Sequence, residues 1–238
     1  MELKSYIDKL RESDLTQEER LQIVYEDVRD YIQFDFLPEI DDISPEEVFR
    51  LRKGQCNNKT VLIHKILTEL GFDVTVYFST IDKNIHRGFF PSLLFFFTPK
   101  YIGHSWIVVK LDKREITLDG YINDLELFNS AIELNRRLGW KTGHSVAIGE
   151  CGASAEFSLH SENFVQMEAI EKEMARTKAP RNWLQSQENP NQVNLIKRLL
   201  YRLFLPIIRK RVQRVRLRNH PSFSNTTSKA STPVSQKR

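Results

Sequence analysis

Cysteine is scarce in this sequence, and long apolar runs and metal-binding motifs are missing. Only two cysteines occur in 238 residues, too few for a disulfide framework, so we expect free, reduced thiols. Residues 1–5 do not open a signal peptide, and no apolar run approaches the roughly 20 residues of a membrane-spanning helix. Zinc-ligand spacings and phosphate-binding glycine loops are also missing. These absences predict a cytoplasmic protein that uses no metal and no cofactor.

Acidic residues are missing from the last fifth of the chain. Glu188 is the last of the 31 acidic residues, whereas residues 189–238 contain 12 Lys or Arg. Residues 1–188 therefore carry 23 basic and 31 acidic residues, a formal charge of −8, and the remainder carries +12. Opposite charges of this size attract each other, and the net charge of +4 describes neither part.

Composition divides the chain into three parts. We expect a domain over 1–178, a basic amphipathic helical segment over 179–218, and a disordered Ser- and Thr-rich tail over 219–238. Three roles are open for the amphipathic segment. It packs on the acidic body, it binds an anionic membrane surface or a partner protein through 193–218, or it binds nucleic acid. Nucleic acid ranks last, because few aromatic residues are interleaved with the basic ones.

Of these roles we favour packing on the body, since the body is always present at high effective concentration. Packing would bury Leu199, Leu203 and Ile207 and turn the arginines of the segment toward carboxylates of the body. Pro206 predicts a kink or a break between two helices.

Local signals predict both helices and strands in the first 178 residues. Thr16 begins a capping box and Ser44 begins a second helix. Residues 72–79 alternate like a strand, and helical spacing returns over 123–138. A mixed-charge helix is predicted over 162–178, packed through Phe164, Met167, Ile170 and Met174.

A phenylalanine-rich run, Phe89–Phe97, lies in the long connection 83–103. The run is too short to cross a bilayer. One interpretation is a hydrophobic lid folded onto the body, since long loops tend to be packed or functional. The other is one wall of a pocket for an apolar substrate group.

Cys56 occupies a position that favours reactivity. It follows Gly54 and opens a predicted helix that ends at Gly71. The N-terminus of a helix favours an anion, so this position tends to lower the pKa of the thiol. The alternative is a buried structural cysteine. Cys151 follows no helix start and is the weaker candidate nucleophile.

Two strands, 104–111 and 115–119, are predicted to form a hairpin. With a two-residue turn at 112–113, residues whose numbers sum to 225 face each other. The pairs are Ile107–Leu118, Val109–Ile116 and Lys110–Glu115, which match apolar with apolar and cation with anion. His104 and Asp119 then become diagonal neighbours on the other face. A three-residue loop would instead separate them onto opposite faces.

Cys56, His104 and Asp119 together supply the groups needed for nucleophilic catalysis. A thiolate attacks, a histidine takes and returns the proton, and a carboxylate orients the imidazole. The N–H of Cys56 at the helix start is a candidate donor to an oxyanion, and the side chain of Gln55 is a weaker one.

The sequence resembles the transglutaminase-like superfamily over about residues 15–125. The resemblance rests on Gly54-Gln55-Cys56 opening a helix, on His104-Ser105-Trp106 on a strand, and on Thr117-Leu118-Asp119 on the next strand. It implies an α+β, papain-like core in which the cysteine helix packs on an antiparallel sheet, followed here by C-terminal helices.

The resemblance also implies thiol-dependent acyl transfer, or amide hydrolysis when water is the acceptor, with an amide or thioester as substrate. Cys56 would be the nucleophile, His104 the base and Asp119 the orienting acid, and Gln55 and Trp106 would contact the oxyanion or the substrate. The chain departs from animal transglutaminases in having Asn57 where they have Trp. Arylamine N-acetyltransferases share the triad, so small-molecule acyl transfer stays open. A catalytically silent binding module, docked by its basic segment, is the alternative.

Overall fold

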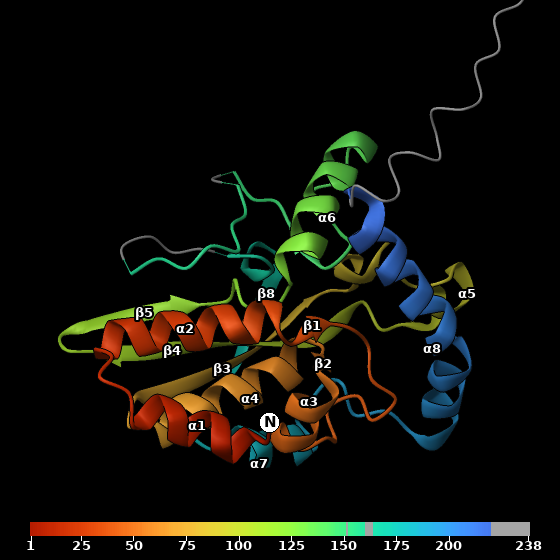
Figure 1. Cartoon of the computed structure of the whole chain (residues 1–238). Coiled ribbons are helices and arrows are strands. Elements are labelled where there is room, and N and C mark those ends of the chain that lie inside the picture. The colour runs from red at the N-terminus through yellow and green to blue at the C-terminus, as the bar shows by residue number, and fades with distance from the viewer. Residues whose placement is uncertain (151, 160–163, 220–238) are drawn as a thin grey trace, which may run out of the picture.

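The protein has an α+β fold built on a four-stranded antiparallel sheet (Figure 1). The structure is a computed structural model and describes residues 1–150, 152–159 and 164–219. The strand order is β5-β4-β3-β8. These strands are β3 (Asp73–Asp82), β4 (Tyr101–Leu111), β5 (Arg114–Leu118) and β8 (Ile170–Thr177). The predicted α+β class with an antiparallel sheet is confirmed.

Helices surround the sheet, and several begin where the capping signals predict. Thr16 caps α2 in a full capping box, and Ser44 caps α3 with Pro45 in its first turn. The α-helices are α1 (Leu3–Arg11), α2 (Gln17–Asp30), α3 (Pro45–Leu51), α4 (Cys56–Glu69), α5 (Ser92–Phe97), α6 (Leu125–Leu138), α7 (Pro180–Gln185) and α8 (Leu195–Arg216). In the described parts of the chain, no helix has both the length and the hydrophobicity of a membrane span.

Short elements connect these parts of the fold. Two-stranded pairs form between β1 and β2, in parallel, and between β6 and β7, antiparallel. The short elements are β1 (Gln33–Phe34), β2 (Lys53–Gly54), β6 (Thr142–Gly143), β7 (Val146–Ala147) and the 3₁₀ turns η1 (Lys83–His86), η2 (Met167–Ala169) and η3 (Leu217–Asn219).

The predicted register of the β4–β5 hairpin is confirmed. Ile107 pairs with Leu118, and Lys110 pairs with Glu115, whose charged atoms lie 3.7 Å apart. Asp112 takes a left-handed conformation, with φ of 54°, in the two-residue turn. Because side chains alternate along a strand, this register fixes which of them share a face.

The two faces of the sheet have different coverings. Ile107 and Val109 join the main core with Leu62 and Ile66 of α4, so α4 covers their face. His104 and its neighbours on the opposite face are buried under the segment that runs from β7 to β8. The sheet therefore separates the body of the cysteine helix from the face that carries the histidine.

The helix predicted over 162–178 is wrong. Residues 160–163 lie outside the described residues, and Ile170–Thr177 form β8 at the edge of the sheet beside β3. Apolar residues three or four apart imitate a helical face, but the free edge of β3 offers main-chain partners to this segment. Glu171, Lys172 and Glu173 remain exposed, and charged side chains are common on edge strands.

The basic segment packs on the body, as predicted, but through other residues. Ile208 and Val212 of α8 are buried in the main core, and α8 lies against α6. Leu199, Leu203 and Ile207, which were expected to be buried, are 58%, 71% and 45% exposed. The helix runs without a break through Pro206, so of the two predicted alternatives the break between two helices is wrong. The tail predicted over 219–238 lies, from residue 220 onward, outside the described residues.

Arginines of α8 bind main-chain carbonyls of the body more often than carboxylates. Arg209 donates to the carbonyl of Phe36 over 2.8 Å, and Arg211 to that of Phe90 over 2.9 Å. Arg216 alone forms a buried pair: Nε and Nη2 each lie 2.8 Å from an oxygen of Asp124. Arg198 and Arg209 also lie 3.8 and 3.9 Å from the carboxylates of Asp42 and Asp35. The connection after β1 therefore offers α8 both carbonyls and, at longer range, the predicted carboxylates.

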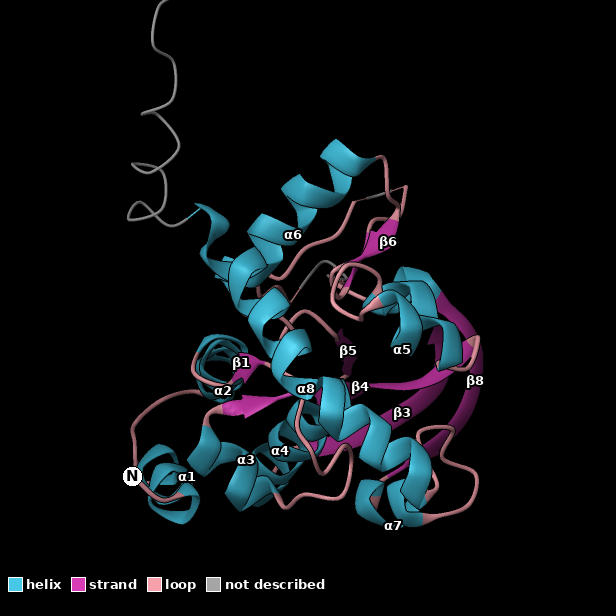
Figure 2. Ribbon diagram, turned by 90° about the vertical axis from the view of Figure 1, so that its right-hand side faces the viewer, coloured by secondary structure: helices cyan, strands magenta, loops and turns pink. Residues whose placement is uncertain are grey.

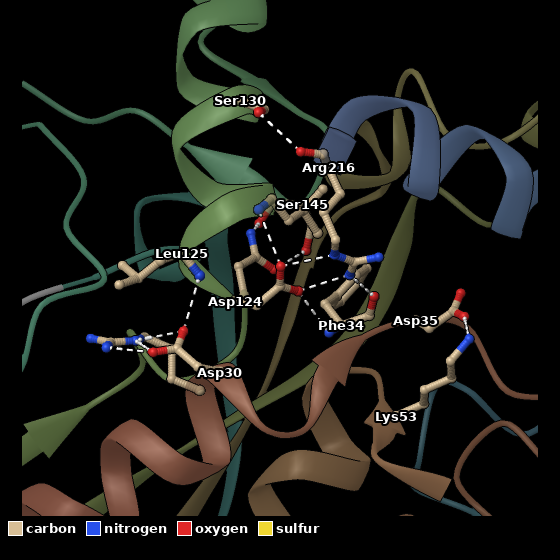
Figure 3. Close-up of polar contacts among 12 residues, drawn as sticks. Asp30, Phe34, Asp35, Lys53, Asp124, Leu125, Ser130, Ser145 and Arg216 are labelled. Carbon is tan, nitrogen blue, oxygen red and sulfur yellow. Dashed lines mark hydrogen bonds and ion pairs between the residues drawn. The ribbon is translucent and has the colours of Figure 1, made fainter. Parts of the chain in front are cut away.

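Figure 3 shows how this pair fastens the C-terminal end of α8. Asp124 is the N-cap of α6, and its Oδ2 also accepts the N–H of Phe34 over 3.0 Å. Arg216 donates in addition to the carbonyl of Phe34 over 2.6 Å. Burial by itself would raise the pKa of Asp124, but the hydrogen bonds and charge of Arg216 outweigh it and lower the pKa. The carboxylate thus joins α6, β1 and α8.

Candidate active site

Cys56 is the first residue of α4, and contacts with β4 hold this end of the helix. Ser105 donates through Oγ to Oδ1 of Asn57 over 2.8 Å, and its carbonyl accepts the hydroxyl of Thr60 over 3.1 Å. The N–H groups of Asn57 and Ser105 also bind the sulfur of Cys56. The thiol is therefore held beside the main chain of the residue that follows His104.

The predicted lowering of the pKa of Cys56 is wrong in direction. Burial raises the pKa of this thiol, and the negative charge of Asp41 raises it further. The N–H groups of Asn57 and Ser105 act in the other direction but do not outweigh burial. A helix N-terminus favours the thiolate only in so far as solvation permits, so the resting group is a neutral thiol that needs a base.

His104 and Asp119 are adjacent, as the register predicts. Nε2 of His104 lies 3.2 Å from Oδ1 of Asp119, and both side chains are fully buried. The two atoms are close but not aligned as a hydrogen bond, a looseness common in unliganded sites. Nδ1 of His104 has no hydrogen-bond partner among the described residues, which leaves that nitrogen available for a proton from another group.

Three consecutive main-chain N–H groups hold Asp119 in place. Oδ2 accepts from Val165 over 2.9 Å, from Gln166 over 2.7 Å and from Met167 over 3.2 Å. Gln166 in turn donates from its side chain to the carbonyl of Ser145 over 3.0 Å. One carboxylate oxygen is thus fixed by the main chain and the other is left for His104.

Asp41 gathers four side-chain amides on the other side of the thiol. Its Oδ2 accepts from Asn57, Asn189 and Asn191 over 3.0, 3.2 and 3.0 Å. Its Oδ1 lies 3.4 Å from Nε2 of Gln55. This carboxylate joins the start of α4 to the segment before α8, and its charge acts on the thiol.

Sequence reasoning missed Asp41 and its asparagines. Asn57 lies 16 residues from Asp41, and Asn189 and Asn191 lie 148 and 150 residues from it, so no spacing rule joins them. Residues 35–42 are rich in acidic residues, but nothing in the sequence singles out one of these carboxylates.

Gln55 and Trp106, the two residues expected to contact the oxyanion or the substrate, lie differently with respect to the cavity beside Cys56. Gln55 lies next to Cys56 in the wall of a cavity, but its amide donates to Asp41. Trp106 is not among the residues that line this cavity. Its ring stacks on His104, with ring centres 5.9 Å apart, and on Tyr77 at 5.5 Å. Trp106 therefore packs against the imidazole outside the cavity wall. Cys151, the weaker candidate nucleophile, lies outside the described residues.

A deep, mostly apolar cavity begins at Cys56 and encloses about 990 Å³, open mouth included. Its polar end contains Gln55, Cys56, Gln166 and Asn191. Its apolar wall consists of Phe34, Phe36, Ile40, Ile81, Phe90, Leu94, Phe97, Ile102, Val193 and Leu200. The phenylalanine-rich run thus forms one wall of a cavity.

His86 also faces this cavity, and its ring packs 4.5 Å from that of Phe90. Burial lowers the pKa of His86 to about 3, so the ring is neutral at physiological pH. His86 therefore adds no charge to the cavity wall.

Among the described residues, no group of three or more His, Cys, Asp or Glu side chains is placed to hold a metal ion. The arrangement offers a thiol, a paired imidazole and carboxylate, and an apolar space that ends at the thiol. No family model matches this chain, and comparisons with curated proteins and with solved structures find no match either.

Proposed function

We propose that this protein is a cysteine-dependent acyltransferase or hydrolase that uses Cys56, His104 and Asp119, with a papain-like core of the transglutaminase-like superfamily. The observation that carries the proposal is the buried contact of His104 with Asp119, on a strand that also holds the start of the Cys56 helix. A scaffold without catalytic activity has no physical need to bury an imidazole and a carboxylate side by side.

In the first proposed step, the thiol gives its proton to Nδ1 of His104 while the sulfur attacks the acyl carbonyl. For this step, Sγ of Cys56 has to approach Nδ1 of His104, a contact that the proposal adds to those described above. Because burial and Asp41 disfavour a free thiolate, proton transfer has to accompany attack on the acyl carbonyl. Asp119 stabilises the imidazolium that forms. The N–H of Cys56 is placed at the helix start to donate to the oxyanion.

Collapse of the tetrahedral intermediate breaks the bond to the leaving group, which takes the proton from His104, and leaves an S-acyl cysteine. Water or an amine then attacks this thioester and gives its proton to His104. The thiol is restored when the imidazolium returns a proton to the sulfur. Hydrolysis and transfer differ only in the second acceptor.

The cavity favours an acyl group that is apolar and several carbons long. Polar residues lie beside the thiol, and apart from Thr98, Lys197 and the neutral His86 the remaining wall is mostly aliphatic and aromatic. Burial of a methylene contributes about 0.8 kcal/mol, so each added carbon that fits should improve binding until the cavity is full.

The test is a series of soluble esters and thioesters with acyl chains of increasing length. Intact-protein mass spectrometry should detect an acyl adduct, and peptide mapping should place it on Cys56. Hydrolysis should be lost in Cys56→Ala and kept in Cys151→Ala, which serves as the matched control. Equal turnover by the wild-type protein and Cys56→Ala, or an adduct that maps to Cys151, would contradict the proposal.

A further inference from the structure

Two helices that lie beside each other expose most of the large apolar side chains of the protein. Of the 14 large hydrophobic residues that are exposed in the described parts of the chain, eight belong to α5 and α8. We call this surface the α5–α8 face. Its most exposed members are Phe96 of α5, at 76%, and Ile196, Leu195 and Leu203 of α8, at 76%, 72% and 71%. Figures 1 and 2 show the two helices on the same side of the molecule, and contacts join them.

The same face is positively charged. The 22 residues of α8 include eight Lys or Arg and no acidic residue, and α5 has no charged residue. Arg202, Lys210 and Arg214 are exposed between and beside the apolar side chains of α8. Several other arginines of α8 point inward to main-chain carbonyls. Arg202 also donates to the carbonyl of Pro38 over 3.3 Å, so Lys210 and Arg214 are the exposed cations with the least to bind on the described part of the body.

Both helices of this face also line the cavity. Leu94 and Phe97 of α5 and Lys197 and Leu200 of α8 are among the lining residues, as is Cys56. A surface that covers the α5–α8 face would therefore lie against the helices that form the cavity.

We propose that the α5–α8 face docks on an anionic lipid bilayer. Exposed apolar side chains with cations among them are what an interfacial helix presents to a membrane: the apolar groups enter the headgroup region and the cations bind anionic headgroups. An apolar surface of this extent is unusual on a protein that has nothing to cover it. Docking leaves the protein outside the hydrocarbon core and brings the helices that form the cavity to the bilayer surface.

Charge favours a lipid bilayer over two other partners for the α5–α8 face, a second copy of the chain and nucleic acid. In a symmetric dimer through this face, two copies of α8 would come together, each with eight basic residues and no acidic one, and like charges repel. Nucleic acid would satisfy the cations but would leave Leu199 and Leu203 without a partner, since aliphatic side chains add nothing to phosphate binding. A bilayer with anionic lipid satisfies both features.

One consequence rests on the proposed function. If Cys56 forms an S-acyl intermediate, its acyl donor is a lipid or a lipid-linked molecule that is presented by the bilayer. The docking itself does not depend on that chemistry, so it can be measured in Cys56→Ala.

Vesicle co-sedimentation of full-length Cys56→Ala tests the docking. The protein should bind vesicles that contain phosphatidylserine and should bind phosphatidylcholine vesicles much more weakly, and added salt should reduce the binding. Leu199→Asp with Leu203→Asp, and separately Phe96→Asp, should reduce binding at least about tenfold, because each places a charge where an apolar group enters the interface. Lys210→Gln with Arg214→Gln should weaken binding about fivefold for each charge.

Leu138→Asp is the matched control, because Leu138 is also an exposed leucine, at 44%, but belongs to α6. It should bind vesicles like the parent protein. All substituted side chains are exposed, and circular dichroism verifies that each variant is folded. Absence of binding to phosphatidylserine vesicles, or equal binding by the Leu199, Leu203 and Phe96 variants, would overturn the proposal. A dimer in solution that these same substitutions convert to a monomer would also overturn it and would assign the face to a second copy.

Hydrolysis of the soluble esters tests the proposed function independently of vesicle docking. The variants of the α5–α8 face leave the residues that line the cavity unchanged. They should therefore hydrolyse a short soluble ester as the wild-type protein does, while losing vesicle binding. Loss of both properties together would overturn the assignment of this face to docking.

Discussion

Replacement of Lys59 by methionine should stabilise the protein at acidic pH but not at alkaline pH. Lys59 lies one turn after Cys56 in α4 and is fully buried. Its Nζ donates to the carbonyl of Arg29 over 3.0 Å. Burial lowers the pKa of this lysine from 10.5 to about 7, although Asp124 and Asp30 oppose the change.

The sign of the effect follows from proton uptake on unfolding. Between pH 7 and 10.5 the unfolded chain protonates Lys59 and the folded protein does not, so the free energy of unfolding rises with pH over this interval. Below pH 7 the folded protein bears the full cost of the buried cation. Lowering the pKa of Lys59 from 10.5 to about 7 corresponds to a cost of about 5 kcal/mol in the free energy of unfolding, since one pKa unit is about 1.36 kcal/mol.

Methionine removes this cost but also removes a hydrogen bond. Leaving the carbonyl of Arg29 unpaired costs about 1–3 kcal/mol. The net gain from Lys59→Met at pH 6 is therefore about 2–4 kcal/mol. At pH 10 little of the ionisation cost is left, and the variant should be less stable than the wild-type protein by about 1 kcal/mol. The difference between the two proteins should thus change by about 4 kcal/mol across this pH range.

Urea unfolding of both proteins at several pH values between 6 and 10 would measure this change. Lys65→Met is the control, because Lys65 is on the same helix but partly exposed and paired with Glu69. Its pairing contributes about 0.3–0.5 kcal/mol to the free energy of unfolding, and this contribution should not change with pH below pH 10. A difference between Lys59→Met and the wild-type protein that is flat from pH 6 to 10 would refute the argument, because it would mean that Lys59 does not titrate near 7 in the folded protein.

Two further predictions concern the environment of the thiol. Asp119→Asn should keep the fold, because a carbonyl oxygen can still accept the N–H groups of residues 165–167. It should nevertheless lower kcat/KM for a soluble ester by about 10² to 10⁴, since the amide would donate to His104 and impose the wrong tautomer; unchanged kcat/KM at an unchanged melting temperature would remove Asp119 from the mechanism. Asp41→Asn should shift alkylation of Cys56 by iodoacetamide to lower pH, because Asp41 raises the pKa of the thiol; alkylation that follows the same pH curve as in the wild-type protein would show that this charge does not reach the sulfur.

Local rules were sufficient for the elements that set up the candidate site. The turn at Asp112 fixed the hairpin register, and the register alone placed His104 beside Asp119. Such rules work because hairpin pairing and helix caps depend on residues that are close in the chain. The helix start at Cys56 was predictable for the same reason, and so were the caps at Thr16 and Ser44.

The failures have one cause, which is that partners far away in the chain decided the outcome. The free edge of β3 converted the segment before Lys178 from a predicted helix to a strand. The side of α8 that is buried depends on where the carbonyls of the body lie, so its most apolar stripe remained exposed. The pKa of Cys56 depends on burial and on Asp41 more than on the helix terminus that the sequence displays.

The segment after β1 connects α8 with the chemistry of the thiol. Arg209 and Tyr201 of α8 donate to its carbonyls at Phe36 and Leu37, over 2.8 and 3.1 Å. Phe36 lines the cavity, and Asp41, five residues further on, raises the pKa of Cys56. A displacement of α8 would therefore move a wall of the cavity and disturb the carboxylate that acts on the sulfur. Access to Cys56 and the reactivity of its thiol consequently depend on the same set of contacts, and the basic helix is a structural part of the candidate site.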